Sequence, residues 1–135
     1  MSGITKTLHR KNYPAIDAAS PEQSQTGRTI LITGGSAVIG RAAAEAFVTA
    51  GADTVIITSR SAQKAADVAK EIQAKGGGRT KVLGYQLEIR DVNSVNALWD
   101  DMARDGIQVD VLILNTTDLV PPAADGTVIE SFNLG

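Results

Sequence analysis

The sequence predicts an α/β fold, a doubly wound parallel sheet of about four strands with flanking helices. Short apolar runs rich in β-branched residues recur along the chain, and Ala-rich or amphipathic stretches of helical length separate them. Runs that are apolar throughout indicate strands buried on both faces of a sheet. Strands that alternate with helices form right-handed βαβ crossovers, and such a sheet binds ligands beyond the carboxyl ends of its strands.

The individual elements follow from this alternation. Strands are predicted at residues 29–33, at 54–58, within 81–87 and at 109–114. Helices are predicted over 41–50, over 61–75, and from an N-cap at Asp91 to Gly106. Gly51 and the three glycines at 76–78 are well placed to end the first two helices.

Composition indicates one small domain behind a polar leader. Residues 1–27 contain two prolines and few apolar runs, so we expect an irregular leader there and a domain over 28–135. Of the 135 residues, 43% are hydrophobic and only five are aromatic, which implies a core of Val, Ile, Leu and Ala.

Charge and cysteine content exclude several classes of function. The formal net charge is -2 and no segment concentrates basic residues, so nucleic acid is not an expected partner. Without cysteine and with one histidine, the chain has no disulfide framework, no thiolate nucleophile and no cluster with transition-metal spacing. No apolar run approaches the roughly 20 residues of a membrane span. We therefore expect a cytoplasmic protein that holds no metal and does not enter a membrane.

The turn between the first strand and the first helix is the most informative motif. Residues 33–40 read TGGSAVIG, and small residues in such a turn let backbone N–H groups close on a pyrophosphate. The following helix directs the positive end of its dipole at the same anion. The alternative is a strand-to-helix connection whose small residues serve only packing.

The spacing of this turn resembles the T-G-x-x-x-G-I-G motif of the short-chain dehydrogenase/reductase family. Val38 stands in place of the middle glycine, and we expect its isopropyl group to narrow the channel for the cofactor phosphates. The resemblance implies a Rossmann-like NAD(P)-binding domain, here an incomplete version of the family fold. It places these residues of the turn at the cofactor: Thr33, Gly34, Ser36, Val38, Ile39 and Gly40.

The end of the second strand bears on the choice of cofactor. Ser59 and Arg60 follow that strand where an acidic residue would bind the ribose of NAD. The Arg60 guanidinium suits a 2′-phosphate, and an arginine at this place in the family goes with NADP. NADP(H) is therefore expected in preference to NAD(H). The alternative is an exposed charge that precedes a helix.

Two further strand ends resemble family motifs. Glu88 and Ile89 resemble an Asp-Val pair whose carboxylate and backbone contact the adenine. Asn115 is the one match to an N-N-A-G motif, where it either ties neighbouring strands together or borders the adenine-ribose pocket.

Catalytic residues are mostly missing from the resemblance. Residues 126–135 resemble the start of the family's next helix, and Asn133 falls on the asparagine of the catalytic tetrad. The tetrad's serine, tyrosine and lysine have no counterpart, since Tyr13 and Tyr85 are followed four residues later by Asp17 and Ile89 instead of lysine.

These observations favour an NADP(H)-binding oxidoreductase of the short-chain type that acts on a carbonyl/alcohol pair of unknown identity. Two alternatives stay open. One is a catalytically inactive, truncated remnant that still binds the dinucleotide. The other is a nucleotide-binding or scaffolding module that self-associates through an exposed sheet edge.

Overall fold

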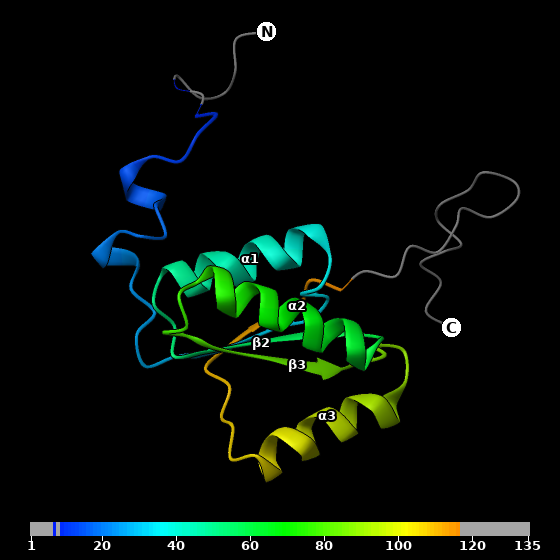
Figure 1. The fold of residues 1–135 in the computed structure, drawn as a ribbon. Coiled ribbons are helices and arrows are strands. Elements are labelled where there is room, and N and C mark those ends of the chain that lie inside the picture. The colour runs from blue at the N-terminus through cyan, green and yellow to red at the C-terminus, as the bar shows by residue number, and fades with distance from the viewer. Residues whose placement is uncertain (1–6, 8, 117–135) are drawn as a thin grey trace, which may run out of the picture.

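The computed structural model describes residue 7 and residues 9–116. Asn133 and the helix predicted at 126–135 lie outside the described residues. Figure 1 shows long helices arranged around a sheet.

Four parallel strands form that sheet: β1 (Thr29–Ile32), β2 (Thr54–Ser59), β3 (Lys81–Gln86) and β4 (Val111–Ile113). Their order is β3-β2-β1-β4, which confirms the predicted doubly wound fold. The strand order reverses between β1 and β4, and the crevice at such a reversal is where open α/β sheets bind their ligands.

Helices cover both faces of the sheet. α1 (Val38–Thr49) and α2 (Ala62–Lys75) lie on one face, and α3 (Val92–Arg104) lies on the other (Figure 1). Ion pairs join α1 to α2, because Glu45 accepts from Lys75 at 3.1 Å and Arg41 donates to Glu71 at 2.8 Å. These ion pairs link α1 and α2 side by side on the same face of the sheet.

The core has two layers separated by the sheet. Ile30 and Ile32 face α1 and α2, whereas Leu31 between them faces α3, and all three are at most 1% exposed. β1 is thus buried on both faces, as its unbroken apolar sequence predicts.

Several element boundaries differ from the sequence prediction, most clearly those of α1 and β4. α1 begins at Val38 instead of Arg41, because Gly40 fits inside the first helical turn and Ala37 supplies the extended N-cap. β4 is shorter than the predicted strand 109–114, because the Asp110 carboxylate accepts from the backbone N–H of Thr29 at 2.8 Å, just before the ladder begins.

The described part of the leader is irregular apart from two single turns of 3-10 helix, Pro14–Ile16 and Pro21–Gln23, each opened by its proline. It is attached to the domain where Gly27 N–H donates to the Asp53 carboxylate at 2.8 Å. Within the described ranges, no helix is long and apolar enough to cross a bilayer.

Candidate functional site

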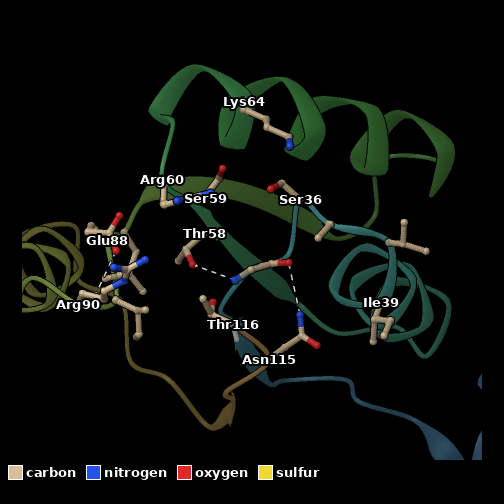
Figure 2. Close-up of a pocket in the computed structure, with 15 residues that line it drawn as sticks. Ser36, Ile39, Thr58, Ser59, Arg60, Lys64, Glu88, Arg90, Asn115 and Thr116 are labelled. Carbon is tan, nitrogen blue, oxygen red and sulfur yellow. Dashed lines mark hydrogen bonds between the residues drawn. The ribbon is translucent and has the colours of Figure 1, made fainter. Parts of the chain in front are cut away.

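A cavity of about 730 Å³ lies at the carboxyl ends of the strands. Its size is within the range of small-molecule and cofactor sites. All four strands contribute through the residues that follow them, and α1 and α2 contribute their first turns (Figure 2). Eight of the residues that the sequence predicts at a cofactor line this cavity: Gly34, Ser36, Val38, Ile39, Arg60, Glu88, Ile89 and Asn115.

The glycines of the turn divide into two roles. Gly34 has a φ of +68°, which favours glycine, and it lines the cavity. Gly35 and Gly40 are buried, and a Cβ on Gly40 would lie 2.3 Å from the Gly34 carbonyl oxygen. On Gly35 it would lie 2.5 Å from the Ile57 side chain. The packing interpretation therefore holds for Gly35 and Gly40, while Gly34 and residues 36–39 line the cavity.

The first turn of α1 differs from those of α2 and α3. Ser61 and Asp91 cap α2 and α3 by accepting hydrogen bonds from backbone N–H groups at 3.2 and 2.9 Å. In α1 the N-cap is Ala37, which has no side-chain acceptor. The first N–H groups of α1 thus have no acceptor within the helix, and the helix dipole adds positive potential beside the cavity.

Val38 is the first residue of α1, and its side chain is 87% exposed at the cavity. No residue other than glycine has a positive φ within the described part of the chain, so valine fits this position without backbone strain. The glycine that the family motif has here is therefore not needed for the backbone conformation. What valine adds is an isopropyl group beside the free N–H groups.

Thr33 has a structural position instead of a cavity-lining one. Its side chain is buried, and its hydroxyl accepts from the N–H groups of Asn115 and Thr116 at 3.0 and 3.2 Å. These bonds tie the end of β1 to the residues after β4. Asn115 ties the end of β4 to the turn, because its side chain donates to the Gly34 carbonyl at 3.4 Å, and it also lines the cavity.

The end of β2 supplies hydroxyl groups and positive charge. Thr58 accepts from Gly34 N–H at 3.3 Å, which fixes the turn against β2. Arg60 and Lys64 line the cavity with exposed side chains, and Figure 2 shows both beside the turn. Among the residues that the structure describes, neither cation forms an ion pair with a carboxylate.

The segment after β3 closes another side of the cavity. Glu88 N–H donates to the Ser94 hydroxyl at 2.9 Å, which holds this loop on α3. The Glu88 carboxylate accepts from Arg90 N–H at 3.4 Å, and Ile89 is 39% exposed. Both predicted residues of this segment line the cavity.

Sequence reasoning missed several cavity residues. Those with a polar side chain are Thr58, Ser59, Lys64, Arg90 and Thr116. The sequence does contain a pattern that could have predicted Lys64. This lysine follows Arg60 by four residues and falls in the first turn of the predicted helix, near the end of the preceding strand. No comparable pattern distinguishes Thr58 or Thr116 from ordinary strand-end residues.

Tyr85 does not line the cavity. It lies in β3 and its hydroxyl donates to the Asp105 carboxylate at 2.6 Å. Burial, together with this hydrogen bond, raises the pKa of Tyr85 to about 12. A tyrosine that transfers protons near neutral pH needs a lowered pKa, so Tyr85 is unsuited to that role.

The other tyrosine also lies outside the set of residues that line the cavity. Tyr13 lies in the leader, with its ring 4.1 Å from that of His9 between centroids. Over residues 9–116, no three His, Asp or Glu side chains come together in a way that could hold a metal ion.

Comparison with known proteins points in one direction. A family model described as short chain dehydrogenase matches residues 28–129. A short chain dehydrogenase of Monascus purpureus is 37% identical over 114 residues, which make up 83% of this chain and 38% of that protein. An uncharacterized oxidoreductase of Mycobacterium tuberculosis is 33% identical over 107 residues, 78% of this chain and 31% of that protein.

Solved structures give the same fold. The Pseudomonas aeruginosa RhlG/NADP active-site complex is similar with a TM-score of 0.65 and 28% identity, over 73% of this chain and 38% of that one. The NADPH-dependent 3-quinuclidinone reductase of Rhodotorula rubra gives a TM-score of 0.66 and 29% identity, over 94% of this chain and 46% of that one. In every one of these comparisons, this chain spans less than half the length of the relative.

Proposed function

Because the chain belongs to the short chain dehydrogenase family, we propose that residues 28–135 are the cofactor-binding part of an oxidoreductase that uses NADP(H). The observation that carries this proposal is the uncapped start of α1, which opens on the cavity beside Arg60. Free N–H groups and a helix dipole suit a pyrophosphate, and an exposed guanidinium suits a second phosphate.

The residues present fit this cofactor. In the proposal, the first turn of α1 binds the pyrophosphate and Arg60 binds the 2′-phosphate. Glu88, Ile89 and Asn115 border the adenosine, and Thr33 and Gly40 hold the turn in shape. When bound, the nicotinamide would supply hydride chemistry between a carbonyl and an alcohol. Similarity to the RhlG/NADP complex and to the NADPH-dependent 3-quinuclidinone reductase supports the choice of cofactor.

Proton transfer needs groups other than those that bind the cofactor. By family resemblance, Asn133 is the asparagine of the catalytic tetrad, and we propose that it holds a water in a proton relay. Neither Tyr13 nor Tyr85 has a lysine four residues later, and Tyr85 has a raised pKa. We therefore propose that these 135 residues bind the dinucleotide but do not by themselves reduce a carbonyl substrate. A cytoplasmic location is part of the proposal.

A scaffolding role is the second candidate, and a particular observation favours it. Leu112 pairs with Leu31 across the β1–β4 ladder and so faces the same side of the sheet. Yet Leu112 is 46% exposed and Leu114 is 73% exposed, whereas Leu31 is 1% exposed. Apolar surface at a sheet edge is a surface for association, and we propose that it binds a second copy of the chain.

Charge reversal at Arg60 tests the cofactor assignment. Arg60→Glu should weaken NADPH binding at least about tenfold and leave NADH binding nearly unchanged, because only NADPH carries the 2′-phosphate. Arg28→Glu is the matched control, since it changes the net charge equally at the opposite end of β1. Equal weakening of both cofactors by Arg60→Glu would remove the 2′-phosphate assignment.

A further inference from the structure

We propose that Lys64 is a second cation for the 2′-phosphate of NADP(H) and that it sets the strength of the preference over NAD(H) together with Arg60. This inference rests on the proposed function, and it adds a specificity-determining residue on α2.

Lys64 lies near the start of α2. Lys64 belongs to the first turn of α2, where its backbone N–H donates to the N-cap Ser61 at 3.2 Å. Its backbone is therefore fixed next to the end of β2. In Figure 2 the side chain descends from α2 with its amino group toward the cavity, on the side of Ser36.

The charges around Lys64 favour an anion. Arg60 and Lys64 are four residues apart and line the same cavity. The first turn of α2 holds no acidic residue, so the helix dipole adds positive potential to that of the two cations. Asp67, one helical turn further on, accepts from Gln63 at 2.9 Å. Two like charges on one cavity wall, with no carboxylate partner among the described residues, are a favourable site for a dianion.

Polar donors complete the same side of the cavity. Ser36 follows Gly34 and Ser59 ends β2, and both are half-buried cavity residues. Their hydroxyls can donate to phosphate oxygens, as neutral donors between the two cations. A 2′-phosphate would thus meet donors from the glycine turn, from the end of β2 and from α2.

Other cations of α2 provide the contrast. Lys75 pairs with Glu45 at 3.1 Å, as expected for a structural surface lysine. Lys70 is exposed on the same helix, but it does not line the cavity. Lys70→Gln therefore removes the same charge from the same helix without touching the proposed site, which makes it a matched control.

The experiment compares affinities by calorimetry for NADPH, NADH and 2′,5′-ADP, a fragment that carries the 2′-phosphate without the nicotinamide. We expect Lys64→Gln to weaken NADPH and 2′,5′-ADP about three- to tenfold and to leave NADH unchanged, the range expected for one charge contact at an exposed site. Lys64→Arg should retain most of the preference, because it keeps the charge. Far-ultraviolet circular dichroism checks that each variant is folded.

The outcomes separate this inference from the function on which it rests. If the unmodified chain prefers NADPH and Arg60→Gln removes the preference, while Lys64→Gln behaves like Lys70→Gln, the role of Lys64 is overturned and the proposed function stands. If the unmodified chain binds NADPH no better than NADH, or binds neither, both fail.

Discussion

Gly40 fixes how closely α1 approaches the turn that it follows. A Cβ at this position would lie 2.3 Å from the Gly34 carbonyl oxygen and 2.8 Å from the side-chain nitrogen of Asn115. Gly77 provides a contrast, because it has a φ of +76° but a Cβ there would meet nothing within 4 Å. Substitution of Gly40 therefore tests steric conflict, whereas substitution of Gly77 tests backbone strain alone.

We expect Gly40→Ala to lower the free energy of unfolding by about 2 kcal/mol, the cost of an overpacked site. Gly77→Ala should cost about 1 kcal/mol, because only the left-handed backbone conformation opposes it. Urea unfolding followed by circular dichroism measures both values. A cost for Gly40→Ala no larger than that for Gly77→Ala would show that the contact is not tight.

Tyr85 should stay protonated to unusually high pH. Its pKa is raised to about 12, from an ordinary value of 10.0, first by burial and then by Asp105. A raised pKa means that the stabilisation is complete below about pH 10 and is lost as the pH rises through about 12. Tyrosinate absorbance in a Tyr13→Phe variant, where Tyr85 is the one remaining tyrosine, follows this ionisation directly.

Asp105→Asn tests how much the Asp105 carboxylate contributes to the raised pKa of Tyr85. It removes the charged acceptor and leaves the burial, so the pKa of Tyr85 should fall but stay above its ordinary value. Ionisation of Tyr85 near pH 10 in the folded, otherwise unmodified chain would contradict the hydrogen bond to Asp105.

At the scale of single residues, the sequence predicts well which residues lie at the ends of the strands. It predicts less well what each of their side chains contacts. Eight predicted cofactor residues line the cavity, because the carboxyl ends of parallel strands meet at one edge. The motif places Thr33 at the cofactor, but its hydroxyl accepts from the backbone after β4. That partner lies some eighty positions away in the sequence, which no local pattern specifies.

At the scale of elements, the start of α1 connects the fold to the proposed function. Its N-cap provides no side-chain acceptor, and Val38 extends from the first turn into solvent at the cavity. The backbone N–H groups in the first turn of α1 can therefore donate to an anion, and the Val38 side chain lies beside them. Under the proposed function, these two features of α1 have opposite effects on cofactor binding.

Replacing Val38 tests this opposition. We expect Val38→Gly to strengthen NADPH and NADH binding alike, by about three- to tenfold, because the pyrophosphate is common to both and the backbone N–H groups become more accessible. Val38→Ala should give an intermediate gain. Unchanged or weaker binding in calorimetric titrations of Val38→Gly would show that the isopropyl group does not obstruct the phosphates.

The existence and order of the elements follow well from the sequence, whereas their ends do not. Apolar runs and helical periodicity predict all four strands and all three long helices of the described part of the chain. The start of α1 differs from the prediction because Gly40 reads as part of a turn, although it occupies a helical position where a larger residue would collide. The short ladder at β4 depends on Asp110 accepting from Thr29, a tertiary contact.

At the scale of the whole molecule, the described helices cover the two faces of the sheet unequally. α1 and α2 pack over one face, while α3 covers Leu31 and Ile56 on the other and leaves Leu112 and Leu114 exposed. Uncovered apolar surface next to an edge strand favours association between copies.

We therefore expect the isolated 135-residue chain to form dimers or larger species in sedimentation velocity experiments. Lysine at both Leu112 and Leu114 should shift it to monomers, because charged residues at a sheet edge oppose association. Ile16→Lys is the control, since Ile16 is 54% exposed in the leader, away from that edge. A monodisperse monomer for the unmodified chain would rule out association at this edge.

Calorimetric titration of the unmodified chain with NADPH and with NADH tests the central claim most directly. We expect saturable binding of NADPH, at least about tenfold tighter than that of NADH, which corresponds to roughly 1.4 kcal/mol from the 2′-phosphate. Equal affinities for the two cofactors, or no binding of either, would contradict the assignment of this cavity as an NADP(H) site.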